Sequence, residues 1–340
     1  MQINTLLEKL YQQNDLNAQE MIAIMQVILQ GQMSDVEITA FVIALKLKGL
    51  TQEELLAAVK VLRTLSKKVE LPEANYVDIV GTGGDESNTF NVSTASMFVA
   101  AAAGVKMVKH GNVSVSSRSG SADVLEALGV NLYLSPEQIQ NCVRRLGLAF
   151  IFAPMHHQTL QHVANVRRLL KTRTLFNLLG PLINPCNAKR HVIGVYDKKW
   201  LLPFAQVLQA LGSEHALILH ADDGLDEISI SAETNIVELK DNEIREYKIQ
   251  PADFALDNYN LQNIRVSDVD KSKTLMLQAL QNKHPAASTI TTLNAGAAIY
   301  VAGVKPTLAE AIDLAKEIVA SQKAFQLLQQ YITLSISLRL

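Results

Sequence analysis

A glycine-rich segment at residues 78–85 has the composition of an anion-binding turn. Gly81, Gly83 and Gly84 follow directly on the short β-branched run of residues 77–80. A turn without side chains lets backbone N–H groups approach an anion that larger residues would keep away. The segment therefore predicts a phosphate-binding turn.

Polar residues then open an apolar, alanine-rich run that extends to residue 103 and predicts a helix. Asn91, Ser93 and Thr94 are residue types that favour the beginning of a helix. There the first N–H groups have no partners within the helix and the helix dipole is positive, so a phosphate or diphosphate would be stabilised. The hydroxyls of Ser93 and Thr94 are further candidate ligands for phosphate or metal.

A third polar cluster, Lys109, His110 and Asn112, follows the expected strand at residues 106–108. Open α/β sheets bind ligands at the carboxyl ends of their strands, so we expect the three clusters to meet in one site. The glycine turn lacks the Gly-Lys-Ser/Thr ending of a nucleotide P-loop and the glycine spacing of a dinucleotide fold. Both of these common classes are therefore disfavoured.

An acidic segment at residues 222–227 follows another apolar run and places four carboxylates at an expected strand end. Carboxylate oxygens suit magnesium, which keeps several waters and bridges a few acidic residues to substrate phosphates. Acidic loops are more often solvated than metal-bound, so the segment by itself leaves both interpretations open.

The elements that must position these residues divide the chain into a helical part and an α/β part. Residues 1–70 predict helices only, with capping boxes at residues 34–37 and 51–54. From residue 71 onward, apolar strands alternate with helical segments, which is typical of an α/β domain with a mostly parallel sheet. The expected strands are residues 77–80, 106–108, 149–152, 191–195 and 216–219.

The second capping box opens an apolar stripe at helical spacing. Leu55, Val59, Leu62 and Leu65 recur on one helix face. Such a stripe is expected in a core or in an oligomer interface.

The composition excludes several classes of protein. The 340 residues are 48% hydrophobic, enough for a sizeable core, and the formal net charge of −2 argues against a protein that coats nucleic acid or an acidic membrane. The N-terminal residues lack a basic region followed by an apolar core, and no run of about eighteen apolar residues occurs, so a cytoplasmic protein without membrane contact is expected. The two cysteines, Cys142 and Cys186, lack metal-ligand spacing and predict free thiols.

Charge is distributed unevenly along the chain. Residues 87–122 and 138–196 contain Lys and Arg but no Asp or Glu. Such segments in an acidic chain would suit the surroundings of a polyanionic ligand. Arg144 and Arg145 are expected instead on a solvated helix face.

Together with the segments at residues 114–121, 173–182 and 293–297, these motifs resemble those of the anthranilate phosphoribosyltransferase family almost from end to end. The resemblance implies a two-domain architecture like that of nucleoside phosphorylases and phosphoribosyltransferases, with a helical domain at residues 1–70 and an α/β domain at residues 71–340. It further implies that a helical segment near residues 160–180 returns to the helical domain and that the substrate cleft lies between the domains.

The same resemblance implies an activity. The family transfers the phosphoribosyl group of phosphoribosyl pyrophosphate to the amine of anthranilate, in tryptophan biosynthesis. It implies Mg²⁺ as cofactor, two ions per site, and a homodimer formed through the N-terminal helices. The two substrates are then the expected partners, with neither nucleic acid nor membrane.

The resemblance also assigns residues to each ligand. Ser93, Asp226 and Glu227 are expected to hold magnesium. Anthranilate is expected at Gly81, Asn112, Arg167 and His157. The positions expected around phosphoribosyl pyrophosphate are Gly81, Gly84, Asp85, Thr89, Asn91, Val92, Ser93, Thr94, Lys109, His110, Gly111, Asn112, Ser114, Ser116, Ser117 and Ser121.

Two positions depart from the family pattern. Val113 stands where the family usually has arginine, and Arg118 stands where it usually has lysine. The second exchange keeps the charge, whereas the first removes one, together with any contact that the arginine makes in the family.

Two other functions are compatible with this architecture. A pyrimidine nucleoside phosphorylase-like enzyme would bind inorganic phosphate and a nucleoside, and the paired Asp226 and Glu227 argue against it. A nucleic-acid-binding relative of the same fold would need a continuous basic face with aromatic side chains. Aromatic residues make up only 5% of this chain, which argues against that alternative.

Overall fold

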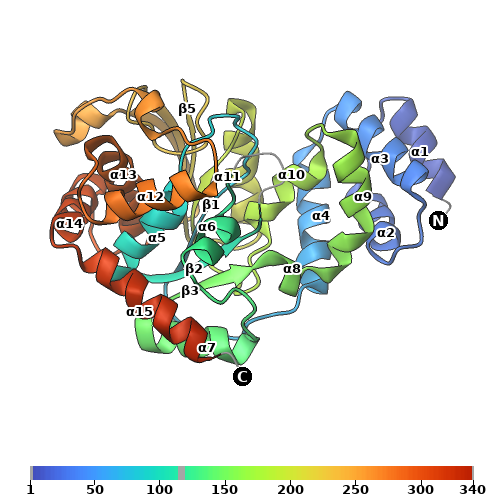
Figure 1. Cartoon of the computed structure of the whole chain (residues 1–340). Helices are drawn as coiled ribbons and strands as arrows, with labels where there is room; N and C mark the ends of the chain where they lie inside the picture. Colours follow the sequence, from blue (N-terminus) through green and yellow to red (C-terminus); the bar gives the residue numbers. More distant parts are fainter. Residues whose placement is uncertain (1–2, 114–118, 339–340) are drawn as a thin grey trace. The chain divides into compact units, whose positions relative to one another are not determined.

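The chain forms two compact units in the computed structural model, which describes residues 3–113 and 119–338. The first unit comprises residues 1–67 and 154–185, and the second comprises residues 68–153 and 186–340. Figure 1 colours the chain by residue number, so the green returning segment can be followed among the blue N-terminal helices of the first unit. The first unit is therefore assembled from two stretches that are far apart in the sequence.

The first unit is helical throughout the described residues. Its N-terminal stretch forms α1 (Ile3–Tyr11), α2 (Ala18–Leu29), α3 (Asp35–Lys48) and α4 (Gln52–Leu65). The returning stretch contains α8 (Ala153–His156), whose first residue belongs to the second unit, α9 (Gln161–Leu170) and α10 (Leu175–Leu179). α9 packs against α2 and α3, and α10 packs against α3 and α4.

Local capping chemistry sets where these helices begin. The Ser34 hydroxyl accepts a hydrogen bond from the backbone N–H of Glu37, and the Glu37 carboxylate accepts one from the N–H of Ser34. Thr51 and Glu54 make the same reciprocal pair at the start of α4. Both predicted capping boxes are confirmed, and each satisfies two N–H groups that a helix start would leave without partners.

The apolar stripe on α4 lies in the core of this unit over most of its length. Leu55, Val59 and Leu62 are fully buried, whereas Leu65 at the end of the helix is 40% exposed. The stripe therefore packs α4 against its neighbouring helices, and α2 is one of them.

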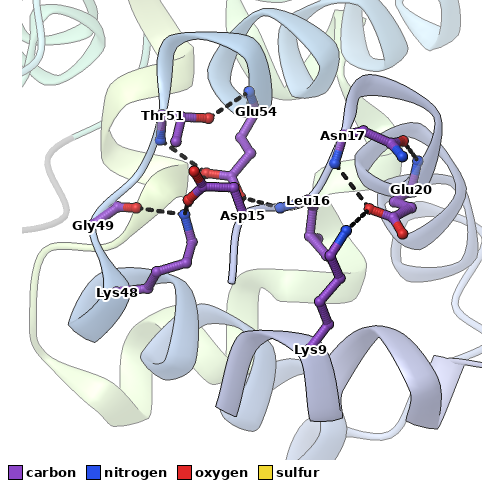
Figure 2. Close-up of polar contacts among 9 residues, drawn as sticks. All are labelled: Lys9, Asp15, Leu16, Asn17, Glu20, Lys48, Gly49, Thr51 and Glu54. Atoms are coloured by element: carbon purple, nitrogen blue, oxygen red, sulfur yellow. Dashed lines mark hydrogen bonds and ion pairs between the residues drawn. The ribbon is translucent and has the colours of Figure 1, made fainter. Parts of the chain in front are cut away.

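A charged cluster joins the α1–α2 loop to the α3–α4 loop of the first unit (Figure 2). The Lys48 ammonium donates to Asp15 (2.6 Å), to the carbonyl of Gly49 (2.7 Å) and to Glu54 (3.0 Å). The other carboxylate oxygen of Glu54 accepts the N–H of Leu16 at 2.9 Å. Glu54 is fully buried, so its charge is balanced by Lys48 and by backbone donors rather than by water.

The second unit is built on a seven-stranded sheet in the described residues. Its strand order is β3-β2-β1-β4-β5-β6-β7. The first five strands in this order are parallel, and β6 and β7 add two antiparallel pairings at one edge. The strands are β1 (Tyr76–Gly81), β2 (Lys106–Gly111), β3 (Leu148–Phe152), β4 (Arg190–Gly194), β5 (His215–Ala221), β6 (Thr234–Lys240) and β7 (Glu243–Ile249).

Helices connect and cover these strands. α5 packs against β1 and β2, and α11 packs against β5 and β6. The crossovers β1–β2 and β4–β5 run in opposite directions along the sheet, so right-handed connections place α5 and α11 on opposite faces. The helices of this unit are α5 (Val92–Ala102), α6 (Ser121–Ala127), α7 (Pro136–Leu146), α11 (Leu201–Ala210), α12 (Val269–Leu280), α13 (Pro285–Val301), α14 (Leu308–Ala320) and α15 (Lys323–Ser337).

Several elements differ from the sequence-based expectation. β2 continues to Gly111, so Lys109 and His110 lie inside the strand and are buried rather than following its end. The antiparallel strands β6 and β7 were not predicted. In the described residues no helix is long and apolar enough to cross a membrane.

Candidate active site

The reversal of strand order places the carboxyl ends of β1 and β4 side by side. Gly81 and Gly194, the last residues of the two strands, face each other in register. Ligands of open α/β sheets bind at such a reversal, outside the carboxyl ends of the strands. The acidic segment after β5 reaches this point, because a Cβ atom on either glycine would overlap Asp226.

Asp226 and Glu227 are held by backbone donors of two other segments. The N–H of Gly83 donates to Asp226 at 2.9 Å, and the N–H of Ser93, in the first turn of α5, donates to Glu227 at 3.1 Å. Gly83 and Gly84 have φ values of 63° and 74°, a conformation that glycine adopts without strain. The tertiary structure thus brings together the glycine turn, the start of α5 and the acidic pair.

The surroundings of Asp226 and Glu227 disfavour the charged form of both carboxyl groups. Burial, together with the charge of Asp85, raises the pKa of Asp226 to about 8. Burial and the charge of Asp226 also raise the pKa of Glu227 well above its usual value. Neutralisation by a bound proton or by a cation therefore stabilises this site.

Lys109 is the buried cation of the same region. Its ammonium group donates to the carbonyl of Ile79 (2.5 Å) and to the Ser93 hydroxyl (3.0 Å). Burial lowers the pKa of Lys109 to about 8, although the charges of nearby acids, Asp78 and Glu227 among them, act in the opposite direction. Lys109 therefore fixes the hydroxyl of Ser93 beside the acidic pair.

The residues present fit a magnesium ion. Glu227 has one buried carboxylate oxygen, Oε2, with no hydrogen-bond partner, and the Asp226 carboxylate and Ser93 hydroxyl supply further hard oxygen donors. Within the described ranges, no group of three or more His, Cys, Asp or Glu side chains is placed to hold a metal. Two carboxylates suit magnesium, because it completes its shell with water and substrate oxygens.

The start of α5 is organised differently from the expected cap. Asn91 occupies the N-cap position, but its side chain makes no capping bond to the helix; it accepts the Thr94 hydroxyl and donates to the carbonyl of Ser119. The N–H of Asn91 donates to Ser272 of α12 at 3.2 Å. The first N–H groups of α5 are thus not covered by the Asn91 side chain.

Several other residues assigned to phosphoribosyl pyrophosphate belong to the second unit. The N–H of His110 donates to the buried Asp78 at 3.1 Å, and the Ser121 hydroxyl donates to the carbonyl of Asn112 at 3.4 Å. Thr89 pairs with Arg265 in an isolated β-bridge. Ser114, Ser116 and Ser117 lie outside the described residues, as does Arg118.

Two residues assigned to anthranilate belong to the helical unit. Arg167 lies on α9, and His157 is buried just before it. Burial lowers the pKa of the Arg167 guanidinium, which stays protonated at neutral pH because arginine starts from a very high value. Gly81 and Asn112, the other two, belong to the α/β unit.

The first two acids of the segment do not join the pair. Asp222 accepts Asn235 (2.6 Å) and Lys248 (3.2 Å), and Asp223 accepts the hydroxyls of Ser229 and Ser231. The hydrogen bonds of these two carboxylates therefore stabilise the conformation of the acidic segment.

Sequence reasoning missed two residues near the pair, Gly194 and Asn294. Gly194 belongs to no recognisable sequence motif. Asn294 lies in the segment 293–297, which contributes to the family resemblance but is not assigned to a ligand.

Comparisons with known proteins agree with this architecture. The model of the glycosyl transferase family, helical bundle domain, matches residues 4–66, and that of the glycosyl transferase family, a/b domain, matches residues 73–325. The chain belongs to this class of transferases.

Within that class, similar proteins and solved structures carry one name. An anthranilate phosphoribosyltransferase of Hydrogenovibrio crunogenus is 48% identical over 98% of this chain and 98% of its own length. The crystal structure of the Thermus thermophilus enzyme matches with a TM-score of 0.91 and 36% identity, covering 97% of this chain and 99% of its own. The Saccharomyces cerevisiae enzyme, in complex with phosphoribosyl pyrophosphate and Mg, matches with a TM-score of 0.89 and 25% identity over 98% of each chain. The chain therefore belongs to the anthranilate phosphoribosyltransferase family, and the phosphorylase and nucleic-acid alternatives find no support.

Proposed function

We propose that this protein transfers the phosphoribosyl group of phosphoribosyl pyrophosphate to the amine of anthranilate in tryptophan biosynthesis. The amine nitrogen forms a bond to the anomeric carbon, the bond from that carbon to the diphosphate oxygen breaks, and the amine loses one proton. The observation that carries this proposal is the acidic pair at the strand-order reversal, in a chain related to these enzymes over nearly its whole length.

An aromatic amine is neutral at pH 7, so it can attack without prior deprotonation by a strong base. The protein then has mainly to position the two substrates and to stabilise the departing diphosphate. No side chain is assigned as a general acid or base.

Phosphoribosyl pyrophosphate is proposed to bind between the glycine turn and the start of α5. The residues proposed to hold it are Gly81, Gly84, Asp85, Thr89, Asn91, Val92, Ser93, Thr94, Lys109, His110, Gly111, Asn112, Ser114, Ser116, Ser117 and Ser121. The proposal is supported by the glycine turn, whose Gly83 and Gly84 have positive φ values, and by the buried ammonium of Lys109, which fixes the Ser93 hydroxyl.

Magnesium is proposed to bind at Ser93, Asp226 and Glu227, with two ions per site. When bound, it neutralises charge that develops on the diphosphate and orients that group. The chain's own part is to hold the two carboxylates through the N–H groups of Gly83 and Ser93.

Arg167 is proposed to bind the carboxylate of anthranilate, with Gly81, Asn112 and His157 near the ring and the amine. A planar guanidinium can donate two parallel hydrogen bonds to a carboxylate, which orients a flat aromatic acid.

We further infer a cytoplasmic homodimer. The N-terminal helix α3 exposes Val36 (79%) and Leu47 (72%), and a second copy would cover these apolar side chains. The cytoplasmic location is supported by the substrate, since a multiply charged phosphate ester does not cross a lipid bilayer unaided.

A single assay tests the function. Protein, Mg²⁺, phosphoribosyl pyrophosphate and anthranilate are mixed, and the loss of anthranilate fluorescence is followed. The double variant Asp226→Asn, Glu227→Gln, purified in the same way, controls for contaminating enzymes. Turnover by the unaltered protein, well above that of the double variant, is expected. Absence of turnover, or activity only with inorganic phosphate and a pyrimidine nucleoside, would show that the proposal is wrong.

A further inference from the structure

Asn294 makes a close contact with the backbone that carries the acidic pair. It lies on α13 and is only 2% exposed. Its side-chain oxygen accepts the N–H of Ile228 at 2.9 Å, and its side-chain nitrogen donates to the carbonyl of Ile228 at 3.0 Å. One amide side chain therefore binds both backbone groups of the residue that follows Glu227.

The side-chain amide of Asn294 makes three hydrogen bonds. The nitrogen of Asn294 also donates to the carbonyl of Ile290, one turn earlier on α13, at 2.9 Å. Both N–H groups of the amide thus have an acceptor, and its oxygen has a donor. The bond to Ile290 holds the side chain in one orientation, so the amide is fixed before it meets Ile228.

The helix that presents Asn294 is itself firmly packed. Nearly every residue of α13 is buried. At Gly296 the helix approaches α14 so closely that a Cβ atom would overlap Ile312. The position of the amide is therefore set by the core of the α/β unit rather than by the acidic segment.

The other contacts of the segment do not replace this one. Asp223 binds Leu225, Ser229 and Ser231, which closes the segment on itself. The N–H groups of Gly83 and Ser93 bind the carboxylates directly. The amide of Asn294 binds the backbone directly after the pair.

We propose that Asn294 is a positioning residue that sets the placement of the Asp226 and Glu227 carboxylates and so their affinity for a divalent cation. The inference rests on the proposed function in one respect, that this pair is the cation site. Asn294 acts through the backbone of Ile228 and touches neither substrate nor cation.

The experiment compares two variants of Asn294 with a matched control on the same helix. Asn294→Leu removes both bonds to Ile228 with an apolar side chain that branches at the same atom, and Asn294→Asp keeps an acceptor for the N–H of Ile228 but loses the donor to its carbonyl. Thr292→Val is the control, because Thr292 is also buried and its hydroxyl donates to the carbonyl of Ser288 within α13.

Two quantities are measured on the full-length proteins without substrates. Mn²⁺ alone is titrated and followed by electron paramagnetic resonance, and hydrogen exchange is measured at the amide of Ile228. Loss of a group that orients metal ligands typically weakens metal affinity by about 10–100-fold, and we expect at least about tenfold for both Asn294 variants. Faster exchange at Ile228 is expected in Asn294→Leu, and Thr292→Val should match the unaltered protein in both measurements.

The outcomes decide the inference in either direction. If Asn294→Leu does not fold, the near-isosteric Asn294→Asp decides. Mn²⁺ affinity within about twofold of the unaltered protein, or an equal loss in Thr292→Val, would overturn the proposal, as would an unaltered protein that binds no Mn²⁺. Because these titrations contain no substrate, a failure of the transferase assay alone would overturn the proposed function and leave this inference standing.

Discussion

At the scale of single residues, the acidic pair shows how the surroundings decide the chemistry of a side chain. Asp222 and Asp223 lie in the same short segment as Asp226 and Glu227, yet they bind Asn235, Lys248 and serine hydroxyls. Asp226 and Glu227 are instead placed where burial and repulsion from neighbouring carboxylates, Asp85 among them, raise their pKa values. A cation relieves that repulsion, and this makes the pair suitable for magnesium.

Neutralising the pair tests that assignment. In Asp226→Asn, Glu227→Gln the side chains keep their size, so the protein should stay folded. Activity should fall, and the magnesium concentration for half-maximal rate should rise, because the charges that attract the ion are gone. The rate is measured across a magnesium titration, with Asp222→Asn as control. An unchanged magnesium dependence would show that the metal site lies elsewhere.

Arg167 tests the assignment of the aromatic substrate. Replacement by alanine should weaken anthranilate far more than phosphoribosyl pyrophosphate, because charge-assisted hydrogen bonds to a carboxylate are worth about 1.5–3 kcal/mol. The neighbouring Arg168, exposed and bonded to Asn165, provides the matched control Arg168→Ala. The two dissociation constants are measured by separate calorimetric titrations. Equal losses for both substrates in Arg167→Ala would contradict the assignment.

At the scale of elements, the antiparallel edge of the sheet holds a polar cluster between β5, β6 and α13. His215 contacts Glu238 through its Nε2 atom at 2.8 Å, and the ring of Tyr300 packs edge-on against His215. Burial would raise the pKa of Glu238, but hydrogen bonds from His215, Tyr300 and Tyr247 outweigh it and hold the pKa below its usual value. The cluster therefore binds the antiparallel strands to the parallel core through a charged group.

This cluster predicts a pH dependence of stability. A carboxyl group with a lowered pKa in the folded protein stabilises it above the unfolded value of about 4.3, and that stabilisation is lost as the pH falls through the folded value. The stability advantage of the unaltered protein over Glu238→Gln should therefore shrink as the pH falls from about 5 to about 3, where the group takes up its proton. Thermal unfolding across this range measures it, with the exposed Glu246→Gln on β7 as control. A constant difference between the two proteins would contradict the prediction.

The loops of the N-terminal helices depend on the charged cluster in Figure 2. In Glu54→Ala, the side chain of Lys48, which is 3% exposed, loses its buried partner, and the N–H of Leu16 loses its acceptor. Breaking a buried ion pair on one side costs about 3–5 kcal/mol. Urea unfolding followed by circular dichroism measures the loss. Glu53→Ala, which removes only an exposed bond to the N–H of Ala18, should cost about 1 kcal/mol or less.

At the scale of the whole molecule, the chain forms two compact units. The helical unit includes residues 154–185, so the N-terminal stretch alone does not make up the whole unit. Within this unit α3 keeps large apolar side chains on its surface. Such a surface on a folded unit favours association with a second copy.

The proposed dimer can be tested on α3. Val36 and Leu47 are eleven residues apart, three helical turns, and so lie on one face. Val36→Asp should convert the dimer to a monomer, because a charge in the interface would be desolvated without a partner. Light scattering at micromolar concentration gives the mass, and Val304→Asp, at an exposed site of the other unit, should remain dimeric. A monomeric unaltered protein would refute the prediction.

The sequence alone determined the features that depend on neighbours in the chain. The capping boxes at Ser34 and Thr51, the parallel strands and the helical N-terminal part were predicted correctly, because caps and hydrophobic periodicity act over a few residues. The hairpin of β6 and β7 also had a local indication that was missed. Asp241 and Asn242 join two strands with positive φ values, which is typical of a two-residue turn.

Only the tertiary structure decided how the site is assembled. Gly194, Asp226 and Asn294 are separated by many residues, and their meeting depends on strand register and on the packing of α13. Lys109 was expected beyond the end of its strand, but β2 extends far enough to bury it under the Ser93 hydroxyl. The length of a strand and the approach of a distant loop are set by pairing and packing across the fold, and a local sequence pattern does not contain them.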